Sequence, residues 1–201
     1  MKTLACLLLS TLLSTTAMAE DTLLAKIAVG LSRSAVLRAQ FIQTKTVAAL
    51  TRPLESSGQL VYARERGILW KIERPYRVSY LLDDAGVTEL DANGVVVASA
   101  GQGPSWQHVS RIFRALFAAD LQALDQYFVA TARGDPARWE IALAPRPALK
   151  RIFQNVQVRG GRFVDQVSFA ETNGDTLVIR FINLREASAL DPSEFGARRR
   201  E

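Results

Sequence analysis

The sequence predicts an α+β fold, mainly antiparallel β: an antiparallel sheet or open barrel accompanied by a few helices. Three observations lead to this fold class. Apolar and polar residues alternate over many short runs, turn residues separate these runs, and only a few regions carry apolar residues at helical spacing. Because most of the runs follow one another with no helix between them, the strands are expected to pair antiparallel rather than in βαβ units.

The strand signals begin at Leu37, where Leu37, Ala39 and Phe41 occupy alternate positions. Similar runs follow at residues 58–62, 68–73 and 78–82, and a second block of strands is expected from Trp139 onward. The turns between the runs are predicted at residues 84–86, 93–94, 160–161 and 173–174, where Gly follows Asn, Ala or Gly. The clearest hairpin is the one whose turn is formed by residues 173–175.

Two regions are expected to be helical. Residues 22–34 carry Leu23, Leu24, Ile27 and Leu31 at helical spacing, with Asp21 as the expected N-cap. From Trp106 to Phe128 apolar residues recur at steps of three and four, which predicts one or two helices with a kink at residues 118–120. A short helical turn is expected at residues 148–153.

These helices are the only elements available to cover the apolar face of the sheet. If they cover it tightly, the result is an ordinary core, and if they cover it loosely, the result is a cavity with a lid. The composition does not separate the two outcomes, and an ordinary core is the commoner one.

The first residues have the order of an export signal. Lys2 supplies a positive charge, residues 4–13 are apolar but too short to span a bilayer, and Ala17 and Ala19 are the small residues before the expected cleavage at Glu20. We therefore expect a signal peptide at residues 1–19, a single domain at residues 20–201, and a mature protein in the periplasm. Cys6 is the only cysteine, so the mature domain is expected to contain neither disulfides nor thiolate metal sites.

The charge of the chain is +5 and is scattered, which does not favour a nucleic-acid partner. The exception is the basic tail at residues 198–200, for which transient contact with an anionic membrane surface and a solubilising role are both open.

Residues suited to catalysis are few, so no enzyme, no cofactor and no metal site is predicted. His108 is the only histidine and is expected on the polar side of its helix. The glycines of residues 101–103 lack the Lys and Ser or Thr of a phosphate-binding loop. The carboxylates of Asp83, Asp84, Glu89 and Asp91 do not have EF-hand spacing and are interpreted as turn caps. A pair of acids for glycoside hydrolysis is neither indicated nor ruled out.

Several segments of the chain together resemble the periplasmic outer-membrane lipoprotein carrier family (LolA-type), as a divergent branch. The segments occur in the family's order and cover nearly all of the expected mature chain. They are residues 37–45, 56–62, 67–70 followed by Arg74-Pro75, 116–121 with Leu124 and Phe128, and 139–145 continuing to the hairpin at residues 173–175.

The resemblance implies an incomplete (open) β-barrel with a helical lid that encloses an apolar cavity. It implies a carrier that shelters the acyl chains of a lipoprotein and passes it from an inner-membrane exporter to an outer-membrane acceptor. A monomer is expected. The residues expected to bind lipid are the apolar and aromatic ones of the sheet and the lid: Leu60, Tyr62, Ile68, Trp70, Tyr80, Ile112, Phe113, Leu116, Phe117, Ile141, Phe169 and Phe181.

The family's arginine at the end of the second strand falls on Arg64, which is therefore expected to latch the lid. The chain departs from the family at residues 65–67, where a proline is usual, and at residues 91–95, which lack aromatic side chains. These departures leave the cargo open between a lipoprotein and another envelope lipid. Two other functions also stay open: a receptor or sensor of the same fold that does not shuttle, and a periplasmic lipid hydrolase.

Overall fold

The computed structural model describes residues 15–91, 94–99, 104–190 and 194–195, and it describes the side chains from residue 23 onward except at 98–99 and 104–109. The helices are α1 (Thr15–Leu31), α2 (Pro104–Ala118) and α3 (Leu121–Asp125). The strands are β1 (Val36–Thr46), β2 (Leu54–Ala63), β3 (Gly67–Arg74), β4 (Val78–Asp83), β5 (Gly86–Leu90), β6 (Val96–Ser99), β7 (Phe128–Asp135), β8 (Arg138–Pro145), β9 (Phe153–Gly160), β10 (Val164–Glu171) and β11 (Thr176–Glu186).

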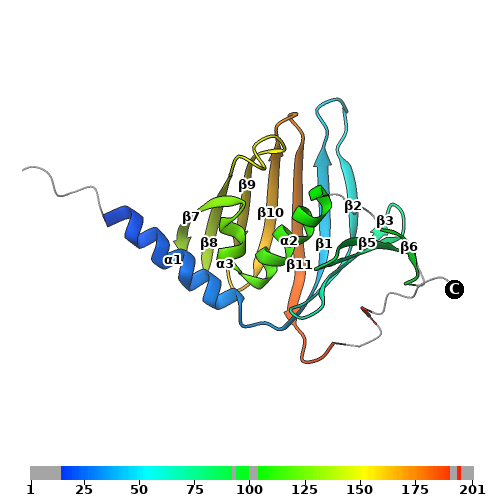
Figure 1. Cartoon of the computed structure of the whole chain (residues 1–201), viewed down its shortest axis with the longest axis horizontal. Coiled ribbons are helices and arrows are strands. Elements are labelled where there is room, and N and C mark those ends of the chain that lie inside the picture. The colour runs from blue at the N-terminus through cyan, green and yellow to red at the C-terminus, as the bar shows by residue number, and fades with distance from the viewer. Residues whose placement is uncertain (1–14, 92–93, 100–103, 191–193, 196–201) are drawn as a thin grey trace, which may run out of the picture.

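All the strands belong to a single 11-stranded antiparallel sheet with the order β6-β5-β4-β3-β2-β1-β11-β10-β9-β8-β7. The sheet is not closed into a barrel, because β6 and β7 form its two edges. The chain passes from β6 to β7 through α2 and α3, which lie across one face of the sheet, while α1 lies beside β7 (Figure 1). We call the face covered by α2 and α3 the inner face and the opposite face the outer face. The expected open antiparallel sheet with a helical cover is confirmed.

The register of the strands places the aromatic residues of neighbouring strands in rows. Leu60 on β2 lies opposite Trp70 on β3, and Trp70 lies opposite Tyr80 on β4. Such cross-strand neighbours share one face of the sheet. Beside this row, β2 and β3 approach closely at Gly58, where a Cβ atom would lie 1.8 Å from the Lys71 carbonyl oxygen. Glycine is therefore required at this position.

The kink expected at residues 118–120 is present as a complete break between α2 and α3. Ala119 has a positive φ of 54°, and the Asp120 amide donates a hydrogen bond to the Ala115 carbonyl, so α2 ends in a left-handed cap. Asp120 then begins α3, because its carboxylate accepts a hydrogen bond of 2.9 Å from the Ala123 amide.

Two expectations about local structure are wrong. The first helix begins at Thr15 instead of Thr22 and ends at Leu31 instead of Ser34, so Asp21 lies inside α1 and does not cap it. The second concerns Phe128, which was assigned to a helix but begins β7, a strand that was not expected. Phe128 continues the three- and four-residue spacing of the preceding helices by coincidence, because its backbone pairs with Pro145 of β8.

Several expectations fall outside the described residues. They are the export signal as far as residue 14, the turn residue Asn93, the glycines of residues 101–103, the basic tail at residues 198–200 and the side chain of His108.

The sheet has an apolar core on each face. The larger core lies on the inner face between the sheet and the helices, and it includes the Leu23, Leu24, Ile27 and Leu31 side chains of α1. The smaller core lies on the outer face of β2 to β5 and includes Phe195. The β3 strand lies between the two cores, and its residues from Gly67 to Trp70 are all buried.

Candidate ligand-binding site

The residues expected to bind lipid are brought together in the core of the inner face. All of them belong to this core; Phe113 and Tyr80 are partly exposed, and the others are buried. Leu60, Tyr62, Ile68, Trp70, Tyr80, Phe169 and Phe181 come from the sheet, and Ile112, Phe113, Leu116 and Phe117 come from α2. Ile141 lies on β8, next to the edge strand beside α1.

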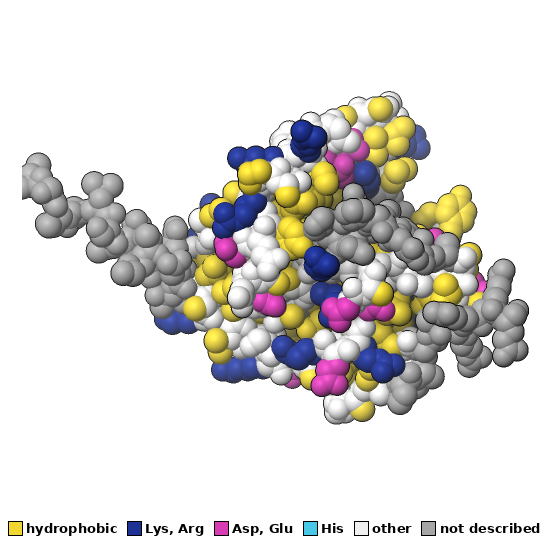
Figure 2. All heavy atoms as spheres, in the orientation of Figure 1, with side chains coloured by type: hydrophobic (Ala, Val, Ile, Leu, Met, Phe, Trp, Pro, Cys, Tyr) yellow, Lys and Arg dark blue, Asp and Glu magenta, His cyan; other side chains and the backbone are white. Residues whose placement is uncertain are grey.

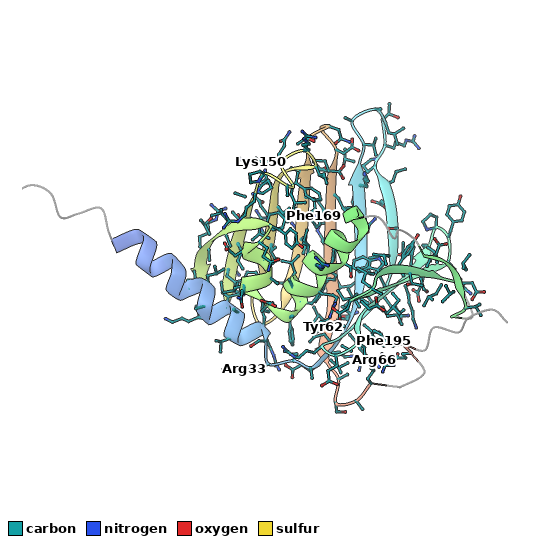
Figure 3. The ribbon with its side chains drawn as sticks, viewed as in Figure 1. Arg33, Tyr62, Arg66, Lys150, Phe169 and Phe195 are labelled. Carbon is teal, nitrogen blue, oxygen red and sulfur yellow. The ribbon has the colours of Figure 1, made fainter. Side chains whose placement is uncertain are left out.

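Aromatic rings connect α2 to strands on both sides of the sheet centre. The Phe113 ring lies 5.9 Å from the Trp70 ring and 5.9 Å from the Phe169 ring. The Phe117 ring lies 5.3 Å from the Phe181 ring and 5.8 Å from the Tyr62 ring. In the view of Figure 3, the label of Phe169 lies higher and that of Tyr62 lower. One helix therefore holds together β2 and β3 on one side and β10 and β11 on the other.

Two further aromatic residues belong to this site. Phe41 on β1 lies 4.1 Å from Trp70, and Phe153 on β9 lies 5.5 Å from Phe169, both measured between ring centroids. Phe41 could have been assigned to the site from the alternation of Leu37, Ala39 and Phe41. Phe153 gives no such signal, since it stands directly after a turn.

The Tyr62 hydroxyl is a buried polar group inside this apolar region. Tyr62 is 2 % exposed, and among the described residues its hydroxyl oxygen has no hydrogen-bond partner. Burial raises the pKa of the Tyr62 phenol, an effect that the nearby positive charges of Arg64 and Arg114 partly offset. The phenol is therefore neutral and retains an unused donor beneath α2.

Two polar interactions join the described side chains of α2 to the sheet. The Ser110 hydroxyl, which is fully buried, donates a hydrogen bond of 2.9 Å to the Asp83 carbonyl at the end of β4. One turn later, Arg114 forms an ion pair with Asp84, whose carboxylate is otherwise exposed. The Arg114 hydrogen bond lowers the pKa of the Asp84 carboxyl. Both contacts join the middle of α2 to the end of β4 and the turn that follows it.

Arg64 lies directly after β2 but contacts a different segment from the expected one. Its guanidinium donates hydrogen bonds to the carbonyls of Ser32 and Ser34, the latter at 3.3 Å, and its backbone amide donates to the Ala35 carbonyl at 2.9 Å. These carbonyls follow the C-terminus of α1. Arg64 therefore bonds to the end of the N-terminal helix and not to the end of α2.

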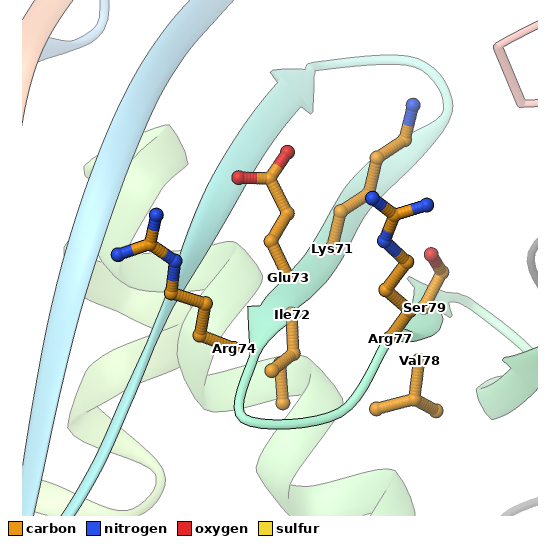
Figure 4. A pocket seen from close by; sticks show the side chains of 7 residues that line it. All are labelled: Lys71, Ile72, Glu73, Arg74, Arg77, Val78 and Ser79. Atoms are coloured by element: carbon orange, nitrogen blue, oxygen red, sulfur yellow. The ribbon is translucent and has the colours of Figure 1, made fainter.

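A hollow of about 560 Å³ lies at the β3–β4 turn (Figure 4), outside the region beneath α2. In Figure 4 the side chains of Lys71, Glu73 and Arg77 point to one side of the ribbon, and those of Ile72 and Val78 point to the other. A lining this polar does not suit an acyl chain. On the face seen in Figure 2, charged side chains of both signs are interspersed with hydrophobic ones.

The described residues offer little chemistry beyond apolar binding. Within them, no group of three or more His, Cys, Asp or Glu side chains is placed to hold a metal ion. Among the helices that the structure describes, none is both long and apolar enough to cross a membrane.

Comparisons with known proteins are consistent with this architecture. The family model described as outer membrane lipoprotein carrier protein LolA-like matches residues 14–174 of the chain. No curated protein matches it.

Among solved structures, MucB has 11% sequence identity and a TM-score of 0.53, and the match covers 90% of this chain and 64% of MucB. The MucA/MucB complex of Pseudomonas aeruginosa matches with 11% identity and a TM-score of 0.49, over 88% of this chain and 60% of that chain. A LolA superfamily protein from Nitrosomonas europaea has 7% identity and a TM-score of 0.47, over 88% of this chain and 97% of that chain. At 11% identity, the likeness to MucB is one of fold.

Proposed function

Because the chain belongs to the LolA-like family of outer membrane lipoprotein carrier proteins, we propose that it is a periplasmic carrier rather than an enzyme. It shelters the acyl chains of a lipoprotein, or of another envelope lipid, between α2 and the sheet and transfers them toward the outer membrane. One observation carries the proposal: the aromatic core of the inner face is shared between the sheet and α2, whose side chains Phe113, Leu116 and Phe117 pack against rings of the sheet.

The energetics of acyl-chain transfer explain why such a site is useful. Exposing a sixteen-carbon chain to water costs about 12 kcal/mol, at roughly 0.8 kcal/mol for each methylene. When α2 moves away from the sheet, an acyl chain takes the place of the Phe113, Leu116 and Phe117 side chains against Trp70 and Phe181. One set of apolar contacts is exchanged for another. The free energies of the empty and the loaded protein therefore differ little, so both loading and release can occur.

The unpaired hydroxyl of Tyr62 also supports a lipid ligand. A purely structural core would be more stable with phenylalanine here, because a buried hydroxyl without a partner is unfavourable. In the loaded protein, this hydroxyl would donate a hydrogen bond to the ester or amide carbonyl that joins an acyl chain to its headgroup.

The proposed location is the periplasm, following cleavage of residues 1–19. The cleavage site before Glu20 lies inside α1, so the mature helix would begin at Glu20 and retain the Leu23, Leu24, Ile27 and Leu31 side chains that pack on the sheet. N-terminal sequencing of the periplasmic protein tests this part of the proposal.

The test of the carrier function compares Phe113→Asp with Gln122→Asp. Phe113 faces the sheet from α2, whereas Gln122 is exposed on α3. Each protein is purified from the periplasm, its lipid is extracted, and the lipid is identified by mass spectrometry. We expect acyl lipid in the wild type and in Gln122→Asp, and its loss from a folded Phe113→Asp. Equal lipid content in all the proteins would contradict the proposed site.

The second candidate is a receptor that binds lipid without shuttling it. MucB, which shares this fold, crystallises in complex with MucA, and this favours the receptor over the hydrolase as the alternative. The two candidates differ in delivery. A carrier loaded with labelled lipid passes it to acceptor vesicles that display an outer-membrane acceptor, whereas a receptor retains it.

A further inference from the structure

The hollow at the β3–β4 turn is lined largely by basic side chains. Lys71, Arg74 and Arg77 contribute three positive charges to the lining, and Glu73 contributes one negative charge. The Glu73 carboxylate already accepts a hydrogen bond of 2.7 Å from the Gln59 side chain on β2. Among the described residues, none of the three cations has an ion-pair partner. The lining of the hollow is therefore positively charged overall.

The register of β3 brings two of these cations to one face of the sheet. Lys71 pairs with Ser79 of β4 on the outer face. Strict alternation along β3 would then send Arg74 to the inner face together with Ile72. However, the register shifts after Ile72, so that Arg74 pairs with Ser57 of β2 on the outer face. Because paired residues share a face, this bulge turns Arg74 toward the same side as Lys71.

The hydrogen-bond donors of the hollow suit a phosphate group. In the view of Figure 4, the Lys71 ammonium, the Arg77 guanidinium and the Ser79 hydroxyl lie on the same side of the ribbon. A guanidinium presents pairs of N–H donors that match two phosphate oxygens, and an ammonium or a hydroxyl adds a single donor. A phosphate monoester carries a charge of about −1.5 to −2 at neutral pH, which complements the excess of cations.

The same turn contains an exposed aromatic side chain that favours a lipid headgroup as the source of the phosphate. Tyr76 directly precedes Arg77, and its side chain is 81% exposed. Tyrosine rings are enriched at the headgroup level of membranes, because one end of the ring is apolar and the other is polar. A turn that combines such a ring with cations is suited to an anionic membrane surface.

We propose that this hollow is a phosphate-binding site and that the phosphate belongs to the headgroup of an anionic phospholipid. The phosphate oxygens accept hydrogen bonds from Lys71, Arg74 and Arg77, while the Tyr76 ring rests among the neighbouring headgroups. The hollow lies outside the acyl-chain site beneath α2, and its lining is charged where that of the acyl-chain site is apolar. Headgroup binding would hold the protein on a membrane surface whether or not an acyl chain is bound.

Sedimentation with phospholipid vesicles tests the site. The probe is a phosphatidylcholine vesicle that contains phosphatidic acid, whose headgroup is a phosphate monoester, and vesicles of phosphatidylcholine alone are the reference. We expect the wild type to bind the vesicles that contain phosphatidic acid. The triple variant Lys71→Gln, Arg74→Gln, Arg77→Gln should bind them at least about tenfold more weakly, because it lacks the cations of the hollow.

A second triple variant controls for the total charge of the protein. Lys150→Gln, Arg151→Gln, Arg180→Gln removes three positive charges from exposed positions outside the hollow. Its net charge equals that of the first variant, so the two proteins feel the same general attraction to an anionic surface. We expect the control to weaken vesicle binding by less than about threefold.

Inorganic phosphate distinguishes a headgroup from a soluble phosphate. When it is added at constant ionic strength, it should shift the amide resonances of residues 71–79 in the NMR spectrum of the wild type. The same resonances should stay in place in the first triple variant. If phosphate shifts them but the wild type does not bind the vesicles, the site takes a soluble phosphate, and the assignment to a headgroup is wrong.

The proposal is overturned if the two triple variants lose vesicle binding to the same extent, because the attraction would then depend on total charge alone. It is also overturned if phosphate leaves the resonances of residues 71–79 of the wild type unchanged, a result that does not depend on the folding of any variant. Acyl-lipid content, measured in the same proteins, reports on the carrier site separately. Failure of the phosphate site would therefore leave the proposed carrier function standing.

Discussion

The Tyr62 hydroxyl is a polar atom in a place where an apolar one would make the empty protein more stable. Replacing Tyr62 with phenylalanine keeps the ring that lies 5.8 Å from Phe117 and removes only the unpaired hydroxyl. We expect Tyr62→Phe to raise the free energy of unfolding of the empty protein by about 1–3 kcal/mol, because an unsatisfied buried group is removed.

The same substitution should weaken the binding of an acyl ester, since the ligand carbonyl loses its donor. Urea denaturation and titration with a fluorescent acyl ester measure the two effects on one sample. Phe41→Tyr is a control that adds a hydroxyl in the same region. A Tyr62→Phe protein with unchanged stability and unchanged binding would show that the hydroxyl has no role in either state.

Arg64 is expected to act on α1, because its hydrogen bonds reach the carbonyls of Ser32 and Ser34. Removing the guanidinium in Arg64→Leu loses charge-assisted hydrogen bonds of about 1.5–3 kcal/mol, so the segment after α1 should separate from the end of β2 about ten- to a hundredfold more often. Because α1 packs on the core of the inner face, we expect Arg64→Leu to bind lipid at least as well as the wild type and to deliver it poorly.

A vesicle-to-vesicle transfer assay with labelled lipid measures the delivery by Arg64→Leu. Arg66→Leu removes an exposed arginine from the same turn and is the matched control. Unchanged delivery by Arg64→Leu would leave Arg64 as an ordinary surface residue that caps the end of α1.

Individual residues were predictable where they follow a strong period. Phe113, Leu116 and Phe117 lie on one side of α2 because three- and four-residue spacing places them there, and they do meet the sheet. The contacts of Arg64 were not predictable, because they depend on the backbone path after α1. Ser110 was missed as well, since a lone serine inside a helical pattern gives no sign that its hydroxyl is buried.

The attachment of α2 to the β4–β5 turn should depend on pH through Asp84. The Arg114 hydrogen bond lowers the pKa of the Asp84 carboxyl in the folded protein. A lowered folded-state pKa gives a stabilisation that is present above the unfolded value of about 3.9 and is lost as the pH falls through the folded value. Because Asp84 is 93% exposed, solvent screening limits the effect to below about 1 kcal/mol.

Asp84→Asn should therefore increase the opening of α2 at neutral pH by at most about fivefold. It should also abolish the further increase in opening that acidification causes in the wild type. Hydrogen exchange of the α2 backbone amides measures this opening. Glu65→Gln, at an exposed position in the β2–β3 turn, is the control. If α2 exchanged at the same rate in Asp84→Asn and in the wild type at neutral pH, the ion pair would have no part in holding the helix.

The errors in the predicted secondary structure have local causes. In β7 only Phe128 and Ala132 are buried, so the strand lacks a clear alternating pattern, and Phe128 extends the spacing of α3. The break between α2 and α3 was predictable because alanines and Asp120 interrupt the apolar stripe. Its form was not, since Ala119 adopts a positive φ that usually requires glycine.

The arrangement of the whole chain as one open antiparallel sheet was predictable, because the turns follow one another so closely. The second core was not recognised, although the sequence carries a signal for it. Residues 60–63, 67–70 and 80–82 are continuous runs of apolar or small residues, which is typical of strands buried on both faces. The alternation of Ile68, Trp70 and Ile72 with Lys71 and Glu73 obscured that signal.

The sequence pattern alone does not decide whether the inner face is an ordinary core or a lipid site. Only the resemblance to the family favours the lipid site. The packing is compatible with both, since most of the proposed lipid-binding side chains are buried against one another in the closed protein. An ordinary core and a lipid site differ in whether α2 moves off the sheet when a ligand binds. This depends on a free-energy difference of a few kcal/mol between the closed and the ligand-bound protein.

The most direct test of the lipid site is quenching of Trp70 fluorescence by a brominated acyl chain. Trp70 contacts Phe41, Phe113 and Phe181 at the centre of the proposed site, and a bromine atom quenches indole fluorescence only at short range. Full-length protein is titrated with a phospholipid brominated in its acyl chain, and Trp70→Phe is titrated alongside it. We expect saturable quenching in the wild type and its loss in Trp70→Phe. Quenching of equal amplitude in both proteins, or none in the wild type, would contradict an acyl-chain site between α2 and the sheet.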